Sequence, residues 1–168
     1  MARLFAGTSG FAYPRWKPTF YPDGLPSKKF LEHYSRRLNS VEINYTFRRL
    51  PLASTLANWV AATPDGFRFA LKAHQRITHF QRLKNSEEFT TSFFASIEPL
   101  LNAGKLGPIL FQLPPQLHCN VPLLADYLTL LPRSVPIAFE FRHTSWLNDE
   151  VYGLLMERDV CQIGIAHV

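Results

Sequence analysis

Short runs rich in β-branched and aromatic residues alternate with amphipathic stretches along the whole chain. Such runs predict strands, and six of them occupy residues 3–7, 40–44, 67–72, 108–113, 137–141 and 160–166. Between the runs, apolar residues such as Phe30, Leu31 and Tyr34 recur at helical spacing. The longest helical stretch follows Ser86, and Pro99 is expected to kink or restart it. This alternation predicts an α/β fold in which helices cover a parallel sheet.

The predicted strands have two unlike sides, because successive side chains of a strand point to opposite faces. One side is almost wholly apolar, whereas polar residues lie on the other side, near the carboxyl ends of the runs. These polar residues are Glu42, Asn44, Lys72, Gln112, Glu140 and Arg142. Polar groups in that position are typical of the inside of a (β/α) barrel, whose C-terminal mouth holds the active site. The sequence therefore predicts a TIM-barrel-like domain with about six parallel strands and outer helices.

A structural explanation of the same residues is open. Glu140 and Arg142 can pair with each other, and Lys72 can pair with Glu42, which would make a charge network without a ligand. An ionic interior is costly where an apolar one would serve, so a ligand site is the favoured hypothesis.

Composition and charge narrow the picture only slightly. The 168 residues are 46% hydrophobic, which is enough for one core and predicts a single domain over residues 1–168. A net charge of +5 favours acidic partners, yet the densest basic group, Lys28, Lys29, Arg36 and Arg37, has the spacing of a solvated helix face. Nucleic-acid binding stays an alternative.

The sequence shows no cysteine motif, membrane span or signal peptide. Cys119 and Cys161 lie outside any CxxC or His/Cys ligand spacing, so we expect ordinary core thiols. No run approaches the roughly 18 apolar residues of a membrane span, and no signal peptide is recognisable. We therefore expect a cytoplasmic protein without a membrane partner.

Five motifs resemble a known family. They are "GTSGFAYPRWKPTFYP" at 7–22, "VEINYTF" at 41–47, "FALKAHQRITH" at 69–79, "LFQLPP" at 110–115 and "FEFRHTSW" at 139–146. In this order they resemble the YecE-like family, a domain of unknown function (number 72), and the resemblance runs through the whole chain. It implies a barrel related to the (β/α)8 type and assigns no activity.

The resemblance also implies that the chain is short. Family members continue into further strands, and a complete barrel takes at least about 200 residues. We therefore expect a domain truncated at its C-terminus. The missing strands would leave open sheet edges, through which another copy can associate.

The candidate site residues fall into two groups. Glu42 and Glu140 are the acid/base candidates, because burial can raise a carboxyl pKa toward neutrality, and His79 is a third candidate for proton transfer. Lys72 and Arg142 suit a phosphate or carboxylate. The further ligand-binding candidates are Thr8, Asn44, Gln112, His143 and Trp146. For His79 and His143 a loop-fixing hydrogen bond is the alternative, and for Trp146 it is a plug at the barrel end.

These residues predict a pocket for a small anionic or polyhydroxylated ligand, with acid/base chemistry of a hydrolase or isomerase kind. The histidines and glutamates would suit a divalent metal, but no HxH or HExxH spacing supports one, so no cofactor is assigned. The alternatives are a nucleic-acid-binding or nucleic-acid-processing protein and a non-catalytic interaction domain.

Overall fold

The computed structural model of the protein describes residues 3–164, whose strands form one parallel sheet. The strand order is β1-β2-β3-β4-β5, and every neighbouring pair is parallel. The strands are β1 (Ser40–Ile43), β2 (Arg68–Lys72), β3 (Leu106–Gln112), β4 (Ile137–Glu140) and β5 (Cys161–Ile163). The α/β class and the parallel sheet are therefore confirmed.

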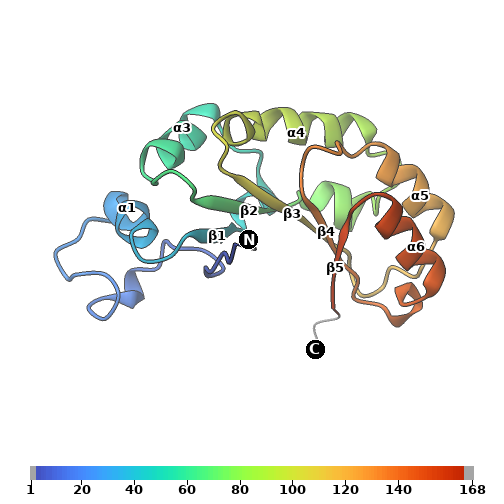
Figure 1. Ribbon diagram of the computed structural model, residues 1–168, viewed down its shortest axis with the longest axis horizontal. Helices are drawn as coiled ribbons and strands as arrows, with labels where there is room; N and C mark the ends of the chain where they lie inside the picture. The colour runs from blue at the N-terminus through green and yellow to red at the C-terminus, as the bar shows by residue number, and fades with distance from the viewer. Residues whose placement is uncertain (1–2, 165–168) are drawn as a thin grey trace.

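Helices connect the strands and lie along one side of the sheet, as Figure 1 shows for α3, α4 and α5. Asn120 and Asn148 begin α5 and α6, and each side chain accepts a backbone N–H three residues on. The helices are α1 (Phe30–Ser35), α2 (Tyr45–Arg48), α3 (Ala53–Ala61), α4 (Glu87–Asn102), α5 (Val121–Thr129) and α6 (Asp149–Glu157). A π-helix (Arg76–Phe80) follows β2, and 3-10 turns lie at Pro14–Trp16, Ser27–Lys29 and Thr144–Trp146.

Helix α4 runs through Pro99 in one piece, so the expectation of a restart is wrong. The proline removes one hydrogen bond, the one to the carbonyl of Ala95. Ala95 is exposed, so water can bond to that carbonyl instead. On the opposite face, Phe93 and Ile97 are buried and hold the helix on the sheet. Burial of that face outweighs the loss of one bond at the surface. The helix ends instead before Gly104, which has a φ of +63°.

The first predicted strand, at 3–7, is not a strand. Residues 6–10 run beside β1 instead. The carbonyls of Ala6 and Thr8 accept backbone hydrogen bonds from β1, and the N–H of Gly10 donates one to it. A single bridge, between Ser9 and Glu42, joins the two segments. Leu4 is 82% exposed, so the start of this segment buries too little apolar surface to hold a regular strand. Within residues 3–164 the sheet has five strands, where six were predicted.

The last predicted strand, at 160–166, is present but shorter. Strand β5 covers Cys161–Ile163 and pairs with β4. Residues 165 and 166 lie outside the described part of the chain. Ile163 is 42% exposed, and self-association through this edge stays a prediction.

The apolar sides of the strands form the core beneath the helices, as the alternation predicts. Phe139 lies at its centre, fully buried, and stacks on Phe111 at 5.1 Å and on Phe141 at 5.7 Å between ring centroids. Trp59 was expected in the core but is only partly buried, with its ring stacked 5.6 Å from that of Phe69. The buried strand residues on this side include Val41, Ile43, Phe69, Leu71, Ile109, Phe111 and Phe139.

Replacing Phe139 by alanine should lower the free energy of unfolding by about 3–5 kcal/mol, because the ring leaves a cavity between two other aromatic rings. Urea denaturation measures the change. Phe80→Ala is the matched control, since the Phe80 side chain is 71% exposed and its loss should change stability by less than about 0.5 kcal/mol. Equal effects of the two substitutions would show that the sheet faces are assigned wrongly.

Candidate functional site

Three polar side chains at the carboxyl ends of β2, β3 and β4 are joined by hydrogen bonds. Lys72 Nζ donates to Gln112 Oε1 at 2.8 Å. Gln112 Nε2 donates to both carboxylate oxygens of Glu140, at 2.9 and 2.8 Å. Gln112 and Glu140 are also partners in the strand register. The amide of Gln112 therefore bridges a cation and an anion, with its oxygen toward Lys72 and its nitrogen toward Glu140.

Arg142 follows β4 and extends this group. Its Nε lies 3.7 Å from Glu140 Oε1, which is within ion-pair range but too long for a hydrogen bond. That Nε is buried and finds no hydrogen-bond acceptor among the described residues. A buried donor without an acceptor costs about 1–3 kcal/mol. The position therefore calls for a further acceptor.

Glu42 lies in a second group at the end of β1. Its Oε1 accepts hydrogen bonds from Ser9 Oγ at 3.1 Å and from Asn44 Nδ2 at 3.0 Å, and Asn44 Nδ2 also donates to Ser9 Oγ at 2.7 Å. Sequence reasoning chose Thr8 in this loop and missed Ser9. The hydroxyl of Thr8 bonds to Tyr34 and to the carbonyl of Gly10 instead. Ser9 could have been chosen only from its pairing with Glu42. That pairing depends on how the first segment is aligned with β1, which the sequence pattern does not give.

Lys72, in the first group, interacts electrostatically with the carboxylates of both groups. Burial lowers its pKa from the ordinary value of 10.5, while the charges of Glu42 and Glu140 act in the opposite direction. The ammonium also lies 4.7 Å from the centre of the Phe47 ring, in cation–π contact. One hydrogen bond holds it in place, and an ammonium has three donors. Lys72 therefore keeps donor capacity for a ligand.

His79, on the π-helix after β2, lies beside the same cations. Its ring packs edge-on against Phe47 at 5.0 Å, and its Nδ1 bonds to Thr78 Oγ1 at 2.9 Å. Burial lowers its pKa below the ordinary 6.5, and the positive charges of Lys72 and Arg142 lower it further. His79 is therefore neutral at pH 7. We call Lys72 and Arg142 the cationic corner of the site, and His79 lies beside it.

Two candidates lie apart from this corner. Trp146 is fully buried, stacks on Phe141 at 4.7 Å and donates its indole N–H to the Leu117 carbonyl. It offers no surface to a ligand, which fits the plug alternative. His143 Nδ1 bonds to the backbone N–H and the hydroxyl of Ser145. His143 thus makes the loop-fixing hydrogen bond that is the alternative to ligand binding.

Trp146 therefore borders no open pocket, and the hydroxyl of Thr8 is taken up by its bonds to Tyr34 and to the carbonyl of Gly10. Within residues 3–164 no three His, Cys, Asp or Glu side chains are arranged to hold a metal ion. The helices in that part of the chain include none that is long and apolar enough to cross a membrane.

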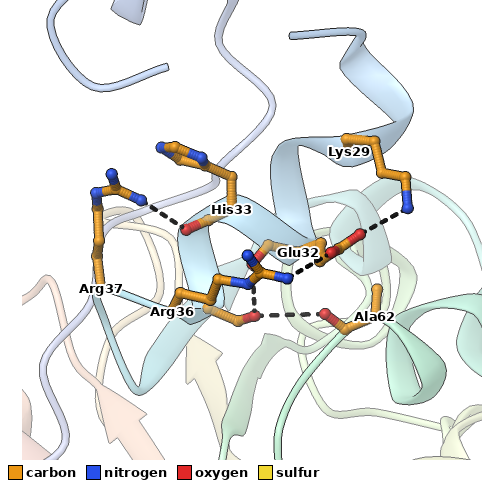
Figure 2. A network of polar contacts seen from close by, with 7 residues as sticks. Lys29, Glu32, His33, Arg36, Arg37 and Ala62 are labelled. Carbon is orange, nitrogen blue, oxygen red and sulfur yellow. Dashed lines mark hydrogen bonds and ion pairs between the residues drawn. The ribbon is translucent and has the colours of Figure 1, made fainter. Parts of the chain in front are cut away.

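The basic group flanking α1 is partly neutralised. Figure 2 shows Glu32 between Lys29 and Arg36, at 2.7 and 2.8 Å from their nitrogens. The hydrogen bond from Lys29 and its charge lower the pKa of Glu32. Arg37 turns away and donates to the carbonyl of His33. These pairings favour a solvated helix face over a nucleic-acid surface.

Comparison with known proteins decides the family. A family model described as "Protein of unknown function DUF72" matches residues 5–166. The chain belongs to the DUF72 family. The resemblance to YecE-like proteins is thereby confirmed, because two curated relatives carry the UPF0759 name. These are UPF0759 protein YunF of Bacillus subtilis, 34% identical over 141 residues, and UPF0759 protein YecE of Escherichia coli K12, 28% identical over 166 residues.

The matches to these DUF72 relatives cover 80% and 98% of this chain but only 50% and 58% of YunF and YecE. A DUF72 crystal structure from Thermotoga maritima is 30% identical, with a TM-score of 0.78 over 94% of this chain and 63% of the other. One from Enterococcus faecalis has a TM-score of 0.75 over 93% of this chain and 58% of the other, at 24% identity. The second likeness concerns the fold alone.

Replacing Gln112 by leucine should lower the free energy of unfolding by about 1–3 kcal/mol, because Glu140 and Lys72 each lose a hydrogen-bond partner. Urea denaturation at pH 7 measures the change. The control is Gln116→Leu, since Gln116 is exposed in the loop after β3. An equal loss in both variants, or none in either, would show that the bridge adds nothing to stability.

Proposed function

We propose that the protein binds a small anionic ligand at the carboxyl ends of the strands, with the anionic group in the cationic corner. The observation that carries this proposal is the buried Nε of Arg142, which lacks an acceptor among the described residues. An oxygen of a phosphate or carboxylate would supply that acceptor, and arginine suits both groups through its forked donors.

The charges around the corner support an anion over a closed network. Glu140 is 8% exposed, and both of its oxygens already accept hydrogen bonds from Gln112. Lys72 uses one of its donors on Gln112, and the Nε of Arg142 finds no acceptor among residues 3–164. The acidic side of the group is thus satisfied, whereas the basic side has unused donors. Such an imbalance is what an anion would correct.

The two glutamates are the proposed acid/base groups for any reaction at this site. Glu140 is buried beside the cationic corner, and Glu42 is half-buried and held by Ser9 and Asn44. A carboxylate held in place next to a bound anion can take or give a proton on a neighbouring carbon or hydroxyl group. A hydrolase or isomerase acting on a small polyhydroxylated anion would use these parts.

The proposal includes the architecture around the site. We infer a TIM-barrel-like arrangement, in which the polar face of the sheet is the inside of the barrel. Five parallel strands in sequential order, with helices on one side, support it, as do polar groups at the carboxyl ends of β1 to β4.

Replacing Arg142 by glutamine should weaken the binding of inorganic phosphate at least about tenfold, because a charged two-pronged donor is lost. Isothermal titration calorimetry in low salt measures the affinity. Arg133→Gln, an exposed arginine between α5 and β4, is the control and should bind as the unchanged protein does. Phosphate binding that Arg142→Gln leaves unaltered would remove the proposed site. Binding of an oligonucleotide that falls steeply with salt would favour the nucleic-acid alternative instead.

Sulfate should bind more tightly as the pH falls from 7.5 to about 5, since sulfate keeps its charge in this range while His79 gains one. Burial and the neighbouring cations hold the His79 pKa below 6.5, so the gain should appear below that pH. The variant His79→Gln should lose the part of the gain that comes from His79. An identical pH profile in both proteins would exclude His79 from the site.

A further inference from the structure

Two lysines of the described residues differ in how the fold satisfies their side chains. Lys105 is 5% exposed, and its Nζ donates to the carbonyls of Val60 and Thr63 and to the Thr63 hydroxyl, at 2.8, 2.6 and 3.0 Å. All three of its donors are used, which is typical of a structural role. Lys72 is half-buried, and its Nζ has one hydrogen bond among residues 3–164, to Gln112. Lys72 is therefore held in place with one side of its nitrogen free.

The neighbours of the Lys72 nitrogen favour the neutral amine. No ion pair of the described residues includes Lys72, so the pairing with Glu42 that the sequence allows does not form. Nζ bonds to the neutral amide of Gln112 and lies over the Phe47 ring. Burial lowers the pKa of Lys72, and the charge of Arg142 adds to this lowering against the pull of the carboxylates. A lysine that is desolvated beside a second cation is activated as a nucleophile.

Groups that can move protons lie next to this amine. His79, neutral at pH 7, packs against the same Phe47 ring that Lys72 contacts, at 5.0 Å between ring centroids. A neutral imidazole can take a proton from an ammonium group. On the other side, Glu140 binds the Gln112 amide that holds Lys72. The amine thus has a base beside it and a carboxylate one side chain away.

We propose that Lys72 is a nucleophile that forms an imine with a small aldehyde or ketone carrying a phosphate or carboxylate group. This inference rests on the proposed function, because Arg142 must hold the anionic group while the Lys72 nitrogen bonds to the carbonyl carbon. Both cations adjoin the hydrogen-bonded pair of Gln112 and Glu140, Lys72 through the amide and Arg142 at 3.7 Å from the carboxylate. A sugar phosphate in its open-chain form carries both groups.

The reaction needs no further reactant. His79 takes a proton from the Lys72 ammonium, and the freed electron pair of the nitrogen attacks the carbonyl carbon, while the π electrons move to the oxygen. The C–O bond then breaks, and the oxygen leaves as water with two protons from the nitrogen, one of them returned by His79. An ammonium and a carbonyl group thus give an iminium and one water molecule, and nothing is oxidised or reduced. The iminium makes the neighbouring C–H acidic, so that Glu140 can remove its proton.

Reductive trapping tests the inference on the unchanged protein. Glycolaldehyde phosphate or uncharged glycolaldehyde is added with sodium cyanoborohydride at pH 7, and peptide mass spectrometry follows the alkylation of each lysine. Lys72 should react at least about tenfold faster with the phosphorylated probe than with the uncharged one, because Arg142 holds the phosphate. Exposed Lys84 should react with both probes at similar rates, and Lys105 with neither. Inorganic phosphate should protect Lys72 and leave Lys84 unprotected.

Two variants separate the amine from the anion site. Arg142→Gln should remove the preference of Lys72 for the phosphorylated probe. Lys72→Arg should lose this label and still bind phosphate, whereas Lys84→Arg should keep both. Labelling of Lys72 no faster than that of Lys84, in a protein whose phosphate binding depends on Arg142, would overturn the imine and leave the anion site standing. Fast labelling of Lys72 that neither phosphate nor Arg142→Gln slows would refute the anion site and this inference together.

Discussion

The parallel pairing of two-faced strands is the constraint on which the rest of the structure depends. Each strand must bury its apolar side beneath the helices, which fixes the direction of every second side chain. Because all strands run the same way, their carboxyl ends meet at one edge of the sheet. Lys72, Gln112 and Glu140 are forty and twenty-eight residues apart in sequence and are nevertheless bonded in series. Their contact follows from pairing and direction together.

The amide of Gln112 determines how the charges in this region are balanced. Buried ions are costly unless paired and hydrogen-bonded, and a neutral side chain that offers both a donor and an acceptor satisfies one of each sign. The Gln112 amide donates to both carboxylate oxygens of Glu140. The Nε of Arg142 lies 3.7 Å from Glu140 Oε1, too far for a hydrogen bond. The protein thus satisfies its buried carboxylate first. The remaining donor capacity lies on the cationic side, where we place the anion.

The first loop joins this site to the remainder of the domain through aromatic packing. Tyr21 stacks on Phe30 of α1 at 4.0 Å and donates its hydroxyl to the carbonyl of Phe11 at 2.5 Å. Burial, with a smaller effect of Tyr34, raises the pKa of Tyr21 to about 12, so the hydroxyl stays a donor at all ordinary pH values. Tyr21 therefore ties the loop to α1 through its ring and to Phe11 through its hydroxyl. Ser9 and Tyr13 therefore have fixed positions beside β1.

The sequence by itself determined the α/β class, the parallel direction and the apolar and polar sides of β1 to β4, because alternation along a strand is a local property. It also determined that Glu42, Lys72, Gln112 and Glu140 share one face. Tertiary structure alone decided which of them touch. Strand register, absent from the sequence pattern, made Gln112 the bridge and brought Ser9 to Glu42 in place of Thr8. Trp146 is buried because it packs on Phe141 and bonds to Leu117. The first predicted strand does not form, because Leu4 stays exposed and buries no apolar surface.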